Sequence, residues 1–194
     1  MKRVEIISKK RMFDDFFKVD EAILRYERLD GGMSEPVRRL SLERGDGVAV
    51  LVYRPRQRSV LLVRQFRFPA HAQGEGWLLE VVAGMLEKGE APEETARREI
   101  AEEMGCQVRE LRPISTFYLS PGGSSERIFL YFAEVDEEAP REAGGGLEEE
   151  HEDIEVVELG LEEVWRALDR GEIGDAKTLV ALMWLRRHLG ERGL

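Results

Sequence analysis

The stretch that decides the fold covers residues 84–106 and reads GMLEKGEAPEETARREIAEEMGC. Pro92 is typical of the first turn of an α-helix, and Gly105 is typical of the position just past its end. Apolar residues recur every four positions and predict one buried stripe: Ala96, Ile100 and Met104. The second half of this stretch is therefore predicted to be an amphipathic helix.

The opposite side of the predicted helix is acidic. Glu99 and Glu103 lie four positions apart and share a helix face, and Glu102 lies three positions after Glu99. Carboxylates this close repel one another unless a cation lies between them, and hard oxygen ligands suit Mg²⁺, with Mn²⁺ as a second option. A solvated acidic surface is the alternative interpretation of such a run.

The spacing back toward residue 84 favours a metal site over a solvated surface. The stretch fits the pattern G-x5-E-x7-R-E-U-x-E-E-x-G-U, in which U is a bulky apolar residue. The fixed positions are all met: Gly84, Glu90, Arg98, Glu99, Ile100, Glu102, Glu103 and Gly105. The last apolar position is Cys106, a small substitute. The stretch resembles the Nudix box, and the chain is identified by it as a Nudix hydrolase.

Length, net charge and cysteine count limit the classes of protein to which the chain can belong. The chain has 194 residues, a formal net charge of −10 and one cysteine. The negative charge argues against long nucleic acid as a partner, and one cysteine excludes a disulfide framework. Neither a signal peptide nor a membrane span is expected, so a cytoplasmic enzyme is predicted.

Residues 1–45 are predicted to be strands that precede a catalytic domain at residues 46–194. The strand candidates are Val4–Ile7, Phe16–Arg25 and Val37–Glu43. Three strands joined by tight turns bury little on their own, so a partner subunit is expected to cover them.

The catalytic domain is predicted to be α+β, with a mixed sheet between helices. Residues 77–82 are expected to form one strand, and the strands within 108–118 are expected to break at Pro113. Helices are expected at Leu161–Asp169 and Asp175–His188. The last helix has four core candidates: Leu179, Leu182, Met183 and Leu185.

Similarity extends well beyond the box, and it points to the ADP-ribose pyrophosphatase branch of the Nudix hydrolases. The similar segments are VRRLSLERG (37–45), VRQFR (63–67), WLLEVVAGMLEKGE (77–90), YLSPGGSSER (118–127) and EEEHEDIEV (148–156). This resemblance implies a Nudix α/β/α sandwich plus an N-terminal antiparallel sheet used in dimerisation. It further implies a homodimer in which the N-terminal strands are swapped and complete the partner's substrate site.

The resemblance also implies roles around the metal. Glu99 and Glu103 resemble the main ligands, with Glu102 beside them as a catalytic residue and the backbone carbonyl of Ala83 completing the set. Glu90 and Arg98 resemble structural residues. In the acidic loop, Glu150 is favoured as the base and Glu152 as an extra ligand, although the register leaves Glu148 and Glu149 open.

Substrate contacts are implied in the same way. Arg67 resembles the arginine that grips the diphosphate, and Glu126 resembles a carboxylate that reaches the terminal ribose or its water. Arg39 and Phe16 resemble the groups that hold and stack the nucleobase.

The expected reaction is Mg²⁺-dependent hydrolysis of ADP-ribose to AMP and ribose 5-phosphate. A sibling pyrophosphatase acting on GDP-mannose, or on another nucleoside diphosphate sugar, is the nearest alternative, because AGGG (143–146) and GEIGDAKT (171–178) resemble that group. A nucleotide-binding sensor that cleaves nothing is a second alternative, and it is disfavoured because such domains usually lose box glutamates.

Overall fold

The structure, a computed structural model, describes residues 2–135 and 153–191. It divides into two compact units. The first comprises Met1–Asp46 and Tyr118–Arg127, and the second comprises Gly47–Phe117 and Ile128–Leu194. By its contacts, the segment Tyr118–Arg127 belongs to the same unit as the N-terminal strands.

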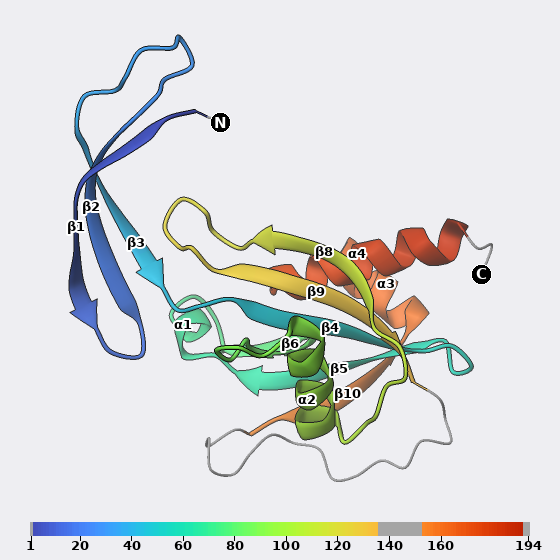
Figure 1. Cartoon of the computed structure of the whole chain (residues 1–194). Helices are drawn as coiled ribbons and strands as arrows, with labels where there is room; N and C mark the ends of the chain where they lie inside the picture. The colour runs from blue at the N-terminus through green and yellow to red at the C-terminus, as the bar shows by residue number, and fades with distance from the viewer. Residues whose placement is uncertain (1, 136–152, 192–194) are drawn as a thin grey trace. The chain divides into compact units, whose positions relative to one another are not determined.

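The first unit contains a three-stranded antiparallel sheet (Figure 1). Its strands are β1 (Val4–Asp14), β2 (Lys18–Tyr26) and β3 (Val37–Glu43), in that spatial order. The first strand is longer than the apolar run at Val4–Ile7 indicated, because pairing with β2 continues through two register shifts. All eleven residues of β1 are exposed.

The second unit is built on a seven-stranded mixed sheet. The main path runs β10 (Glu155–Gly160), β5 (Ser59–Phe66), β4 (Gly47–Arg54), β9 (Arg127–Glu134) and β8 (Arg112–Tyr118). Strands β4 and β9 run parallel, whereas β5 is antiparallel to both β4 and β10. A short helix, α1 (Phe68–His71), follows β5.

One expected strand is two strands. Residues 77–82 were predicted to be continuous, but the structure has β6 (Trp77–Glu80) and β7 (Val82–Met85), interrupted at Val81. Strand β6 pairs with β5 and β7 pairs with β4. The reason is that β4 and β5 pair with each other only over a few residues next to their turn. The chain therefore changes partner at Val81.

A second expectation was also wrong. Pro113 was predicted to break a strand, yet it lies inside β8. Strand β8 is at the edge of the sheet and has a neighbouring strand on one side only. Proline, which has no backbone N–H, is tolerated in an edge strand because no strand lies on the open side to accept a hydrogen bond.

Strand β4 explains the layered arrangement. Its alternate residues Val48, Val50 and Val52 belong to a core that includes residues of α2 (Pro92–Met104). Its intervening residues belong to a second core, with residues of α3 (Leu161–Asp169) and α4 (Ala176–Glu191). Because successive side chains of a strand point to opposite faces, α2 covers one face and α3 and α4 cover the other (Figure 1). This is the expected Nudix sandwich.

Two of the four core residues expected in helix α4 are exposed. Leu182 and Leu185 are fully buried as expected, whereas Leu179 and Met183 are exposed. The buried positions are Thr178, Ala181, Leu182, Leu185 and Leu189. This spacing is one helical stripe, and Leu179 and Met183 lie beside it.

Candidate active site

Helix α2 forms the base of the candidate site. Glu94 accepts a hydrogen bond from the Ala91 N–H at 3.0 Å, which satisfies one of the free donors at the helix start. Gly105 ends the helix in the left-handed conformation, with φ of 61°. Burial of Ile100 and Met104 in the core fixes the rotation of the helix. The rotation leaves Glu102 partly exposed and Glu103 only 3% exposed.

Arg98 lies among three carboxylates of the box. Its Nη1 is 2.7 Å from Glu99 Oε1 and 3.1 Å from Glu102 Oε2, and its Nε is 3.4 Å from Glu90 Oε1. Burial opposes the charge of Arg98, but its hydrogen bond to Glu90 and the charges of all three carboxylates raise its pKa. The hydroxyl of Thr95 and the guanidinium of Arg98 lower the pKa of Glu90. Arg98 therefore offsets the mutual repulsion of these carboxylates.

Gly84 is needed for close packing rather than for an unusual backbone angle. A Cβ placed on Gly84 would lie 1.7 Å from Glu99 Oε1 and 2.7 Å from Glu99 Cγ. The side chain of Glu99 thus lies directly against the backbone of β7. Because Ala83 precedes Gly84 in that strand, the Glu99 carboxylate and the Ala83 peptide belong to neighbouring parts of the structure.

The donor set of α2 fits a hard cation. Glu99 and Glu103 share a helix face and offer carboxylate oxygens, which Mg²⁺ and Mn²⁺ prefer. Within residues 2–135 and 153–191, no three His, Cys, Asp or Glu side chains are grouped closely enough to hold a metal ion. Glu150 and Glu152, the predicted base and extra ligand, lie outside the described residues.

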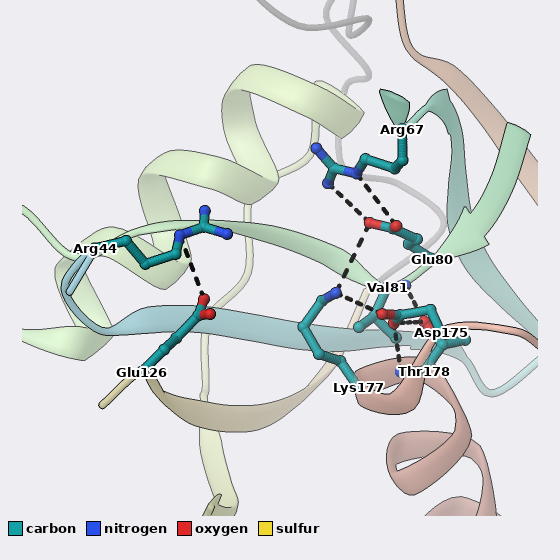
Figure 2. A network of polar contacts seen from close by, with 8 residues as sticks. All are labelled: Arg44, Arg67, Glu80, Val81, Glu126, Asp175, Lys177 and Thr178. Atoms are coloured by element: carbon teal, nitrogen blue, oxygen red, sulfur yellow. Dashed lines mark hydrogen bonds and ion pairs between the residues drawn. The ribbon is translucent and has the colours of Figure 1, made fainter. Parts of the chain in front are cut away.

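Arg67 has a partner that was not predicted from the sequence. Its Nη2 lies 2.8 Å from Glu80 Oε2, and its Nε lies 3.2 Å from Glu80 Oε1 (Figure 2). Burial opposes the charge of Arg67, but Glu80, together with the charges of Glu103 and Asp175, raises its pKa. The paired hydrogen bonds to Glu80 therefore keep Arg67 charged despite its burial.

Glu80 has a second cation near it, from a distant part of the chain. Lys177 Nζ lies 3.9 Å from Glu80 Oε2 and 2.6 Å from Asp175 Oδ1 (Figure 2). Asp175 also accepts hydrogen bonds from the N–H and the hydroxyl of Thr178, at 2.9 and 2.7 Å. The Asp-x-x-Thr spacing is a helix-start signal that the sequence contains. Nothing in the sequence indicates that Lys177 approaches Glu80.

The remaining predicted residues lie in the first unit. Phe16 is 75% exposed and contacts Phe17 edge-on at 4.9 Å between ring centroids. Arg39 is exposed, and its Nη1 donates to the Arg38 carbonyl at 2.9 Å. Glu126 is buried, with Arg44 Nε 3.7 Å away (Figure 2). Arg44 was not predicted as a site residue.

The segment that carries Glu126 is bonded to the end of β3. The Leu42 N–H donates to the Gly123 carbonyl at 2.8 Å, and the Ser125 N–H donates to the Leu42 carbonyl at 3.2 Å. The Ser125 hydroxyl also donates to Glu43 at 2.7 Å. These bonds hold Glu126 in the first unit.

The predicted residues thus fall into three sets. Glu99, Glu102, Glu103, Ala83 and Arg67 lie in the second unit. Phe16, Arg39 and Glu126 lie in the first unit. Glu150 and Glu152 form the third set, outside the described residues.

Comparison with known proteins agrees with the box. The NUDIX domain family matches residues 43–182. ADP-ribose pyrophosphatase of Escherichia coli strain K12 is 40% identical over 187 residues, which are 95% of this chain and 88% of that protein. GDP-mannose pyrophosphatase of Pectobacterium atrosepticum is 38% identical over 181 residues, which are 92% of each chain.

A solved structure supports the fold. A crystal structure of an ADP compounds hydrolase superposes with a TM-score of 0.73 at 20% identity, covering 98% of this chain and 96% of the other. Among the described residues, no helix combines the length and the apolar character that crossing a membrane requires.

Proposed function

Because this chain belongs to the NUDIX domain family, we propose that it is a Mg²⁺-dependent pyrophosphatase that hydrolyses ADP-ribose to AMP and ribose 5-phosphate. The observation that carries the proposal is the packing of Glu99 against Gly84, beside the buried Glu103 on the same helix. A second support is the 40% identity to an ADP-ribose pyrophosphatase over 95% of the chain.

The chain's own residues would hold the metal and the diphosphate. Glu99 and Glu103, with the Ala83 carbonyl, are the proposed ligands, and Glu102 lies beside them. Bound Mg²⁺ would neutralise charge on the diphosphate oxygens. Arg67 would bind the diphosphate through N–H groups that Glu80 does not use.

The reaction needs one water and one base. A water oxygen attacks a phosphorus, the bridging P–O bond breaks, and the water loses a proton to a carboxylate. We assign that carboxylate to Glu150, with Glu148 and Glu149 as alternatives and Glu152 as an extra ligand, all outside the described residues. A carboxylate base contributes about 10²–10⁴-fold to the rate.

The first unit is proposed to select the nucleotide. Phe16 presents an exposed ring that can stack on a base, and Arg39 is exposed on β3. Glu126 is proposed to reach the terminal ribose or its water. A homodimer with swapped N-terminal strands is part of the same proposal, because apolar residues of β1 such as Ile6 and Phe13 are 61% and 54% exposed. A cytoplasmic setting is also part of it, supported by the single cysteine.

The direct test is incubation of the purified protein with ADP-ribose and Mg²⁺, followed by product analysis. We expect AMP and ribose 5-phosphate, and loss of both products when a chelator removes the metal. GDP-mannose, the second candidate because of the 38% identity to a GDP-mannose pyrophosphatase, belongs in the same assay. Cleavage of neither substrate would overturn the enzyme proposal in favour of a nucleotide sensor.

A metal-binding measurement tests the site independently of turnover. Gly84→Ala places a Cβ 1.7 Å from Glu99 Oε1, so the carboxylate must move. We expect weaker Mn²⁺ binding by electron paramagnetic resonance, with the thermal midpoint nearly kept. Gly122→Ala is the matched control, because a Cβ there meets nothing within 4 Å. Equal Mn²⁺ affinity in both variants would remove Glu99 from the ligand set.

Light scattering tests the dimer. We expect twice the chain mass of 22.2 kDa, and a clean monomer at all concentrations would contradict the swapped arrangement.

A further inference from the structure

Four charged side chains of the second unit form a row in which positive and negative charges alternate. In order they are Arg67, Glu80, Lys177 and Asp175, and their contact distances are 2.8, 3.9 and 2.6 Å (Figure 2). Their formal charges sum to zero. We propose that the first turn of α4, through Lys177 and Asp175, is a positioning device that sets the orientation of Arg67 toward a bound diphosphate. This inference rests on the proposed function, which assigns Arg67 to the diphosphate.

The contact between Arg67 and Glu80 fixes the plane of the guanidinium. Two N–H groups of Arg67 bond to two oxygens of one carboxylate, and such paired bonds define an orientation as well as a distance. Glu80 is 2% exposed, so its carboxylate is surrounded by protein. The position of Glu80 therefore determines the orientation of the Arg67 guanidinium.

Glu80 in turn needs a second cation. A buried carboxylate that loses a positive neighbour costs folding free energy or shifts toward its remaining partner. Lys177 is the second cation, and its side chain is 13% exposed. The flexible lysine chain is held by Asp175, whose carboxylate lies 2.6 Å from Nζ. Lys177 therefore attracts the Glu80 carboxylate from the side opposite to its contact with Arg67 (Figure 2), which limits movement of the carboxylate toward the guanidinium.

Asp175 ties this arrangement to the start of α4. Burial would raise the pKa of Asp175, but the charge of Lys177 and hydrogen bonds from Lys177 and Thr178 lower it, so the carboxylate stays ionised. The Thr178 hydroxyl, which donates to Asp175, accepts a hydrogen bond from the Val81 N–H at 2.8 Å. Val81 is the residue at which the chain leaves β5 for β4, so the sheet ladder is interrupted there. The helix start thus holds both the side chain of Glu80 and the next peptide.

The arrangement has one end that faces solvent. The Arg67 side chain is 40% exposed, whereas Glu80, Lys177 and Asp175 are 3%, 13% and 10% exposed. Arginine has five N–H donors, and Glu80 uses two of them. The exposed end of the arrangement therefore has N–H groups that are not used by Glu80 and can bind a ligand.

Lys177→Met tests the proposal, because it removes the charge and keeps an unbranched chain. Misplacing a binding group costs up to about 10²-fold, and we expect KM for the cleaved nucleotide diphosphate to rise about 10-fold with kcat nearly kept. Mn²⁺ affinity should stay at the parent value, because Lys177 is not a proposed ligand. A KM equal to that of the parent would overturn the proposal.

A double-mutant cycle shows whether Lys177 acts through Arg67. If it does, Lys177→Met has no further effect on KM in an Arg67→Ala background, because the group being positioned is gone. Additive effects of the two substitutions would mean that Lys177 acts on its own, and would contradict the proposal. Asp175→Asn, which keeps the shape but removes the charge that holds Lys177, is the second variant if Lys177→Met fails to fold. We expect it to raise KM in the same direction and to show the same dependence on Arg67.

Inorganic pyrophosphate separates this inference from the proposed function. If the parent cleaves no nucleotide diphosphate, the proposed function fails, and calorimetric binding of pyrophosphate with Mg²⁺ still reports on Arg67. Weaker pyrophosphate binding by Lys177→Met than by the parent supports the positioning role. Equal binding overturns it, whatever the substrate.

Discussion

The two units of this chain are stabilised by different interactions. The second unit has two apolar cores, one on each face of its sheet, with residues such as Leu130 and Val63 nearly or fully buried. In the first unit, the buried residues among those described are all polar or charged: Asp20 and Glu21 of β2, Ser34 in the loop after it, and Glu126. Its apolar side chains on β1 face outward. From this comparison we propose that the second unit is stable alone, whereas the first is stabilised by another surface that covers it.

Chemistry and recognition are divided in the same way in the proposed function. The proposed metal ligands and the diphosphate arginine lie in the second unit, and the proposed base-stacking residues lie in the first. Substitutions in the two units should therefore change different measured quantities. The following tests proceed from the largest expected effect to the smallest.

Two buried glutamates, one in each unit, provide the sharpest contrast. Glu103→Gln should lower kcat by about 10³-fold, because metal catalysis is worth several kcal/mol. Glu21→Gln should leave kcat close to that of the parent, since Glu21 pairs with Lys10 and Arg38 and is not a proposed ligand. Steady-state kinetics at saturating Mg²⁺ measures both. A near-normal kcat in Glu103→Gln would show that the box is not the metal site.

Core truncation separates the two units by stability. Leu182→Ala should cost about 2–5 kcal/mol of unfolding free energy, because Leu182 is fully buried. Ile6→Ala on β1 should change it by less than about 0.5 kcal/mol at low protein concentration. Urea unfolding followed by far-ultraviolet circular dichroism reports on both units, and tryptophan fluorescence reports on the second unit alone, which contains Trp77, Trp165 and Trp184.

The Ile6→Ala variant also tests whether the first unit is stabilised by association with another copy of the chain. If Ile6→Ala is costly at high protein concentration and harmless at low concentration, a second copy covers β1 and the first unit is stabilised by association. An equal cost at every concentration would show that the first unit is stable through contacts of its own.

Stacking by the first unit should affect affinity rather than turnover. Phe16→Ala should raise KM by about 5- to 150-fold, since stacking on a base is worth about 1–3 kcal/mol. The value of kcat should change little, because Phe16 is not a proposed metal or proton-transfer residue. Phe13→Ala is the matched control, a phenylalanine of β1 that is 54% exposed. Equal effects of the two variants would indicate a general role of the apolar surface.

The smallest expected effect is a loss of stability of the three-stranded sheet at low pH. Hydrogen bonds from Arg11 and Lys9 lower the pKa of Asp20 to about 2. Because an unfolded aspartate has a pKa of about 3.9, Asp20 stabilises the sheet above about pH 4, and this stability is lost as the pH falls toward 2. Hydrogen exchange of β2 amides between these values measures it. Asp20→Asn should remove the pH step, and an unchanged step would assign it to other carboxylates.

Much of the fold could be predicted because its signals are local. The helix at residues 92–104 follows from Pro92, Gly105 and an apolar stripe of period four, and the structure has α2 over the same residues. Residues 47–53 form a continuous apolar run, which is typical of a buried strand, and β4 forms there. These patterns depend only on backbone geometry over a few residues.

Other features escaped prediction because they depend on neighbours that are distant in sequence. The interruption at Val81 follows from the way β4 and β5 separate, and Pro113 is tolerated because β8 is an edge strand. Leu179 and Met183 are apolar but lie outside the stripe that packs on the sheet. Hydrophobicity alone does not specify which residues of a helix face the core.

By itself, the sequence determined the acidic helix and its family, because an i, i+4 spacing fixes which carboxylates share a face of any α-helix. Only the tertiary structure decided that Gly84 leaves room for Glu99, and that the Val81 N–H meets the Thr178 hydroxyl across 97 positions. Such contacts exist only after the sheet and α4 have packed together. The physical reason is that helix periodicity acts within one turn, whereas the partners of Arg67 and Glu80 are chosen by the packing of distant segments.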